Sequence, residues 1–256
     1  MVLNDLPTWA MAAGWGLVVS LGLMVGALAG FYAPLRHRGI TGIMAAGAGI
    51  LIAAASLDLI ISAVRSAGPM QVGLALILGA SAFSGANVLL ATHAKHRKRC
   101  GECVQQPTEK GAPGSGLAIA IGTLMDAIPE AIVLGLETTR MAMPGLGLIA
   151  AFALGNFAEA LSSSSGMELA GRRKRYIFGL WALATVLVTV LAGASAALAG
   201  LVPQGTIGLC NAFAAGALLA MVVETMIPEA AADSAPFNGV LATLGFLALL
   251  LLIGAA

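Results

Sequence analysis

Long apolar runs, separated by short breaks of proline, glycine and charged residues, make up almost the whole chain. The runs approach the ~20 residues that an α-helix needs to cross a hydrocarbon core of ~30 Å. Long stretches of strict apolar and polar alternation are absent, so the pattern favours a bundle of membrane helices over a β-barrel. We predict eight spans, at about residues 10–32, 41–64, 71–93, 115–137, 145–169, 176–199, 205–228 and 238–255.

The composition agrees with a membrane location. Hydrophobic residues make up 59% of the 256 residues and charged residues only 10%, whereas a soluble domain carries about 25% charged residues. The 33 glycines suit close helix packing in lipid. No basic segment precedes the first apolar run, so we expect that run to be retained and not cleaved as a signal peptide. We predict one all-α integral membrane domain over residues 1–256.

The basic residues are distributed unevenly between alternate breaks. If residue 1 lies outside, only Arg65 and Arg140 remain on the outer side. The other eleven of the thirteen Lys and Arg residues then lie in the breaks at 33–40, 94–114, 170–175 and 229–237. The positive-inside rule therefore predicts that both termini are extracytoplasmic and that the long loop at 94–114 is cytoplasmic.

Five acidic residues lie inside the predicted spans, where a charge at mid-bilayer costs about 2.5–3.5 kcal/mol. They are Asp58, Asp126, Glu130, Glu159 and Glu224. Three further acids near span ends can reach the interface or pair with a nearby base, namely Glu137, Glu168 and Glu229. The five acids within the spans need another explanation.

Two pairs of polar residues share helix faces in the fourth and fifth spans. Asp126 and Glu130 are four residues apart, and Pro129 frees a backbone carbonyl beside Asp126 because proline removes a hydrogen bond. Asn156 and Glu159 are three residues apart in the next span. Since the two spans run antiparallel, both pairs fall about 16–22 Å into the bilayer. The pattern predicts an oxygen-rich cluster near the midplane.

Such a cluster of carboxylates repels itself unless it is protonated or binds a cation. All three histidines lie in the predicted cytoplasmic loops, and no intramembrane base is placed to neutralise the cluster. This favours an external cation, either a metal ion or a proton; the structural alternative is a protonated, hydrogen-bonded network that holds the helices together. A Ser, His and Asp triad is excluded, and no motif supports an aspartyl-protease pair of Asp58 and Asp126. We expect no enzymatic activity.

The fourth and fifth spans resemble the paired metal-binding helices of the ZIP (Zrt/Irt-like protein) transporters, whose fourth helix carries a His-Asn-x-Pro-Glu-Gly type motif. The seventh span, 212-AFAAGALLAMVVETMIPEA-230, is similar to that family's seventh helix, with small residues first and a Glu-x-x-x-Pro-Glu end. Eight spans, external termini and a long loop after the third span extend the resemblance over essentially the whole chain. It implies a ZIP-like bundle that moves divalent cations into the cytoplasm and binds them midway between helices 4 and 5.

The resemblance also implies roles for individual residues. Glu130 and Glu159 match the two central bridging carboxylates of the family. Asp126 falls where the family usually has His, Ala127 where it usually has Asn, and Asn156 within the polar pair before the fifth-helix Glu. In the same way, Glu224 is expected on the cytoplasmic exit path and Asp58 near the external entrance.

This chain departs from the family in two ways that affect the bound ion. No imidazole remains in the site, and the sixth span has no acid, so a second metal position that some members have is lost. The resemblance therefore implies a mononuclear site of Asp126, Glu130, Asn156 and Glu159. All-oxygen ligands favour Mn²⁺, Mg²⁺ or Fe²⁺. Carboxylates also bind Zn²⁺, so the sequence leaves the ion open.

The cytoplasmic loop offers a second candidate metal site. His93, His96, Cys100 and Cys103 have a spacing that could close a tetrahedral site for a soft metal, with thiols that stay reduced in the cytosol. The neighbouring Lys and Arg residues disfavour a dication. The other interpretation is a basic stretch attracted to anionic lipid headgroups.

The function predicted from the sequence is divalent metal uptake through a multi-pass protein of the cell membrane, with a bacterial inner membrane suggested by the compact length. Two alternatives stay open: a proton or other cation carrier on the same acids, and a non-transporting metal sensor whose loop is the active part. The expected partners are membrane lipid and a Zn, Mn, Fe or Mg ion. A homodimer is also considered, and no nucleic-acid partner is expected.

Overall fold

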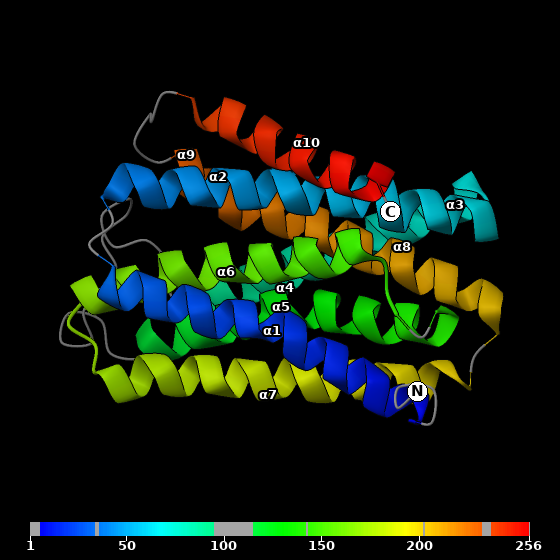
Figure 1. Ribbon diagram of the computed structural model, residues 1–256, viewed down its shortest axis with the longest axis horizontal. Coiled ribbons are helices and arrows are strands. Elements are labelled where there is room, and N and C mark those ends of the chain that lie inside the picture. The colour runs from blue at the N-terminus through cyan, green and yellow to red at the C-terminus, as the bar shows by residue number, and fades with distance from the viewer. Residues whose placement is uncertain are drawn as a thin grey trace.

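The computed structural model describes residues 6–33, 36–94, 115–141, 143–201, 203–231 and 237–255, and every regular element in these ranges is a helix. Within these ranges, seven helical stretches are long and apolar enough to cross a membrane. Figure 1 shows them side by side along the long axis of the molecule, with the start of α1 and the end of α10 toward the same end. The predicted all-α, multi-pass membrane architecture is confirmed at this level.

The eight predicted spans all fall on long helical stretches. Two of these stretches are interrupted by a short π-helix, labelled η, which continues directly into a further α-helix. The helices are α1 (Thr8–Tyr32), α2 (His37–Ala53), η2 (Ala54–Ile60), α3 (Ile61–Ala67), α4 (Pro69–Ala94), α5 (Ser115–Arg140), α6 (Leu146–Leu169), α7 (Lys174–Ala199), α8 (Gln204–Met221), η3 (Val222–Met226), α9 (Ile227–Ala231) and α10 (Asn238–Ala255).

The two π-helices were not predicted, and each contains one of the intramembrane acids. Asp58 lies in η2 and Glu224 lies in η3. A π-turn closes its hydrogen bond five residues back instead of four, so each segment accommodates an extra residue and rotates the side chains that follow. Such bulges are frequent at functional sites.

The helices pack as two groups. In the first group, α1 packs against α6 and α7, and α5 packs against α7. In the second group, α4 packs against α8, and α10 packs against α2. The groups meet mainly where α2 contacts α6 and where α5 contacts α8. The polar helices α5 and α6 therefore both belong to the first group and face the second.

Closely spaced glycines hold α1 against α6. Gly22, Gly26 and Gly30 recur every four residues on α1, so they share one helix face. A β-carbon on any of them would lie 2.2–2.3 Å from a backbone carbonyl oxygen of α6, far inside van der Waals contact. These oxygens belong to Ala153, Phe157 and Leu161. The backbones thus touch along two full turns, as small-residue packing in lipid permits.

Replacing Gly26 by Ala should destabilise the folded protein by about 1–3 kcal/mol, because the added methyl group overpacks a site with no free space. The measurement is the melting temperature of the purified protein in detergent. Gly14→Ala is the matched control, since a β-carbon at Gly14, on the same helix, meets nothing within 4 Å. Equal melting temperatures for the two variants would contradict the proposed packing.

Candidate functional site

Helix α5 carries an acidic stripe along one face. Asp126, Glu130 and Glu137 lie at intervals of four and seven residues, which places them within about 40° of one another around the helix axis and spreads them over ~16 Å. Asp126 and Glu130 are each only 1% exposed, and Glu137 is also buried. Val133, fully buried, fills the same face between Glu130 and Glu137.

The small residues of α5 determine where this stripe points. Ala127 and Ala131 pack in one apolar cluster with Trp181 and Val188 of α7. Ile128 is exposed on the outside of the bundle. Because these contacts fix the rotation of α5 about its axis, the acidic face is turned into the interior of the bundle.

Helix α6 contributes a second buried polar face. Asn156 is 1% exposed and Glu159 is 3% exposed. The side-chain nitrogen of Asn156 and the hydroxyls of Ser162 and Ser163 are buried without a hydrogen-bond partner among the described residues. Buried polar groups of this kind are usually satisfied by water or by a bound ion.

The rest of α6 is tied to its neighbours. The indole nitrogen of Trp181 donates a 2.7 Å hydrogen bond to the Ser164 hydroxyl, which links α7 to α6. On the other side, a β-carbon at Gly155 would lie 3.0 Å from the Leu51 side chain of α2. Asn156 and Glu159 are thus presented from a helix that is packed tightly on both sides.

The structure buries all four residues of the predicted midplane site, but it does not gather the acids into one coordination shell. Helix α5 packs chiefly on α7 and α8, α6 packs chiefly on α1 and α2, and α5 and α6 contact each other only slightly. Over the described ranges, no three side chains of His, Cys, Asp or Glu are arranged to hold one metal ion. The shared site of Asp126, Glu130, Asn156 and Glu159 stays a prediction.

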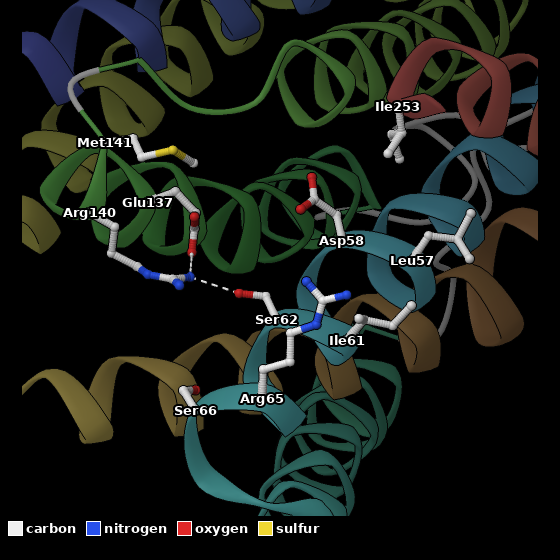
Figure 2. Close-up of a pocket in the computed structure, with 10 residues that line it drawn as sticks. All are labelled: Leu57, Asp58, Ile61, Ser62, Arg65, Ser66, Glu137, Arg140, Met141 and Ile253. Atoms are coloured by element: carbon white, nitrogen blue, oxygen red, sulfur yellow. Dashed lines mark hydrogen bonds and ion pairs between the residues drawn. The ribbon is translucent and has the colours of Figure 1, made fainter. Parts of the chain in front are cut away.

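Asp58 lies elsewhere, in a pocket of about 570 Å³ toward the end of the bundle where α10 ends. Charged groups of both signs project into this pocket, which we call the end pocket (Figure 2). They are Asp58, Arg65, Glu137 and Arg140. The Asp58 carboxylate lies 3.7 Å from the position of a β-carbon on Gly145, the residue that caps the N-terminus of α6. The Asp58 carboxylate therefore lies beside the first turn of α6.

A hydrogen-bonded network joins three helices at the bottom of the end pocket. The guanidinium of Arg140 donates to the Glu137 carboxylate at 3.0 Å and to the Ser62 hydroxyl of α3 at 2.8 Å (Figure 2). The Asn211 amide of α8 donates to the same Glu137 oxygen. The prediction that Glu137 pairs with a nearby base is confirmed. Its position on the acidic face was missed, although the seven-residue interval from Glu130 carries that signal.

Glu224 has partners that the sequence did not suggest. The Ser84 hydroxyl and the Asn87 amide of α4 both donate to its carboxylate, the amide at 2.6 Å. Glu224 is exposed beside α4, and its place on an exit path stays a prediction. Its two contacts tie η3 to α4 within the second helix group.

The candidate loop site cannot be compared with the structure. His93 lies in the last turn of α4, and its side chain is outside the described part of the chain. His96, Cys100 and Cys103 also lie outside the described residues.

Removing the Asn211 amide should destabilise the protein, because it leaves a buried carboxylate oxygen with one donor fewer. We expect Asn211→Ala to cost about 1.5–3 kcal/mol, the usual contribution of a hydrogen bond to a charged group. The effect should shrink in a Glu137→Gln background, because the Gln amide oxygen still accepts a hydrogen bond but lacks the charge that strengthens it. Cys210→Ala, a similar truncation one residue away, is the control. Equal losses for Asn211→Ala in both backgrounds would contradict the coupling.

Comparison with known proteins finds no matching family model and no match among curated proteins. The resemblance to ZIP transporters therefore rests on the residues of the fourth, fifth and seventh spans.

Proposed function

We propose that this protein is a secondary transporter that moves divalent metal cations into the cytoplasm by exposing the carboxylates of α5 and α6 to each side in turn. One observation carries the proposal: Asp126, Glu130, Asn156 and Glu159 come from two helices and are all at most 3% exposed in an apolar bundle. The sequence supplies no Lys, Arg or His in α6 or in α5 before Arg140. A mobile cation is the natural counter-charge for these acids.

We infer that α5 is an eighth crossing and that both termini are extracytoplasmic. This topology is supported by the separation of the basic residues. Arg65 and Arg140 line the end pocket. At the opposite end, the Lys174 ammonium lies 4.7 Å from the ring centroid of Tyr32 and hydrogen-bonds to its hydroxyl. Aromatic residues are enriched at both membrane interfaces, whereas an excess of Lys and Arg is typical of the cytoplasmic side.

In the proposed cycle, the first helix group carries the polar faces of α5 and α6, and it rocks or slides against the second group. The end pocket is the external vestibule, in which Asp58 attracts the arriving cation. Ser162 and Ser163 extend the polar face of α6 beyond Glu159 toward the cytoplasmic end. All-oxygen ligation favours Mn²⁺, Fe²⁺ or Mg²⁺, although carboxylates also accept Zn²⁺.

Uptake of labelled Mn²⁺, Zn²⁺, Fe²⁺ and Mg²⁺ into proteoliposomes tests the proposal directly. Glu130→Gln and Glu159→Gln should each lower uptake at least about tenfold, since even loss of an outer-shell group costs that much metal affinity. The matched control is Glu168→Gln, because Glu168 is exposed on the same helix as Glu159. Undiminished uptake in both variants, with normal folding, would refute the site.

A proton carrier is the second candidate, and the regular spacing along α5 favours it. Glu137, Glu130 and Asp126 follow one another at about 10 Å and 6 Å along one helix face. Val133 fills the wider gap, so a proton relay requires water to enter there when the bundle opens. The two candidates differ in how metals affect proton flux. If the acids bind a dication, competition by Mn²⁺ should abolish proton flux through wild-type protein; flux that is insensitive to all four metals would favour the proton carrier.

A further inference from the structure

The network at the bottom of the end pocket connects the two helix groups. Glu137 and Arg140 belong to α5 in the first group, whereas Ser62 of α3 and Asn211 of α8 belong to the second. We call these four residues the bridging network. Any movement of one group against the other at this end must break or stretch its hydrogen bonds.

The bridging network has a buried half and an accessible half. The Glu137 side chain is 10% exposed, whereas that of Arg140 is 38% exposed and can swing into the water of the pocket. A partly exposed ion pair contributes little to stability. The Arg140 half is therefore weak enough to open and close repeatedly, which a contact that is broken in every cycle requires.

The path below the bridging network is sealed. Along α5, the residues that line the end pocket extend inward only as far as Glu137. The next residues of the same α5 face, Val133 and Glu130, are at most 1% exposed. Closure thus falls within two helical turns, between the network and the predicted cation site. At this level α8 packs on α5, and α3 is joined to α5 by the hydrogen bond between Arg140 and Ser62.

The charges around Arg140 explain why a positively charged side chain suits this position. Two acids, Asp58 and Glu137, and two bases, Arg65 and Arg140, line the pocket, so their formal charges cancel. One Arg140 nitrogen reaches both Glu137 on its own helix and Ser62 on α3, as Figure 2 shows. Arg140 therefore affects access to the cation site indirectly, by its bonds to Glu137 and Ser62, and does not touch the site itself.

We propose that Arg140 is the positioning residue of an outer gate, and that its bonds to Glu137 and Ser62 hold α5 against α3 and keep the acidic face closed to the outside. The cargo of this gate rests on the proposed function. Its outward orientation rests on the topology inferred there, which labelling of Ser66→Cys in intact cells tests separately. The opening itself can be measured without any transported ion.

Thiol labelling measures the opening. In full-length protein with Cys100, Cys103 and Cys210 replaced by Ala, Val133→Cys reports access from the end pocket to the α5 face. Intact cells are treated with a membrane-impermeant methanethiosulfonate. Arg140→Gln should raise the labelling rate about two- to fivefold, the contribution of a partly exposed ion pair to an equilibrium. Ser62→Ala should raise the labelling rate less. Arg140→Lys, which keeps the positive charge, should label at a rate closer to that of the wild-type gate.

Two controls separate gating from general loosening. Thr139→Ala is the matched variant, because the Thr139 hydroxyl donates only within its own helix, to the Leu136 carbonyl. It should leave the labelling rate unchanged. Ser66→Cys, already in the pocket, should label at one rate in every background. If Val133→Cys does not fold, Leu134→Cys, also fully buried, replaces it.

An unchanged rate in both Arg140→Gln and Ser62→Ala, or an equal increase in Thr139→Ala, would overturn the gate. A faster rate without any metal uptake by the wild-type protein would leave the gate standing and remove the proposed cargo. Normal metal uptake with an unchanged labelling rate would leave the proposed function standing and overturn the gate.

Discussion

Direct contact between helix backbones is the constraint on which the rest of this bundle depends. In lipid, burying apolar side chains between helices gains little, so association relies on close packing of small residues. Besides the α1–α6 contact, Gly49 of α2 lies against a backbone carbonyl of α10, and Gly245 of α10 lies against one of α2. Gly79 of α4 and Gly216 of α8 form the same reciprocal contacts. Three helix pairs are therefore held in direct backbone contact.

Helix α5 is held differently, and this matters for its acids. One of its glycines meets a neighbouring backbone closely: a β-carbon at Gly135 would lie 2.4 Å from the Ala192 carbonyl of α7. Elsewhere α5 relies on Ala127 and Ala131 against α7 and on the Glu137 network at its end. Pro129 also removes one of its internal hydrogen bonds. The helix with most intramembrane acids is thus held by alanine packing, a close glycine contact and a polar network.

The helices were predictable because crossing a membrane requires a long apolar run, which hydropathy detects directly. The span expected at 145–169 is Leu146–Leu169, and that expected at 238–255 is Asn238–Ala255. The two π-helices were not predictable, since an extra residue in one turn leaves a uniformly apolar pattern unchanged. Asp58 and Glu224 were therefore identified as candidates without any indication of their local geometry.

The candidate site was predictable only in part, for a related reason. Spacings of three and four residues correctly placed Asp126 with Glu130, and Asn156 with Glu159, on buried helix faces. Spacing within a helix does not say which other helix it meets, and α5 packs more on α7 and α8 than on α6. Asn211 was missed because it lies 74 residues from Glu137, and spacing within one helix does not reveal a contact of that kind.

The balance of charge changes along α5, and that change gives the proposed path a direction. At Glu137 the negative charge is matched within one helical turn by Arg140 of the same helix. At Glu130 and Asp126, about two and three turns further into the bundle, no base of α5 or α6 is near in sequence. A cation that passes Arg140 therefore leaves water and a neutral set of charges for a region of buried carboxylates and low dielectric, where attraction between opposite charges is stronger. The buried acids then offset the desolvation cost of the cation. Arg140 lies at the boundary between the neutral end pocket and this acidic region.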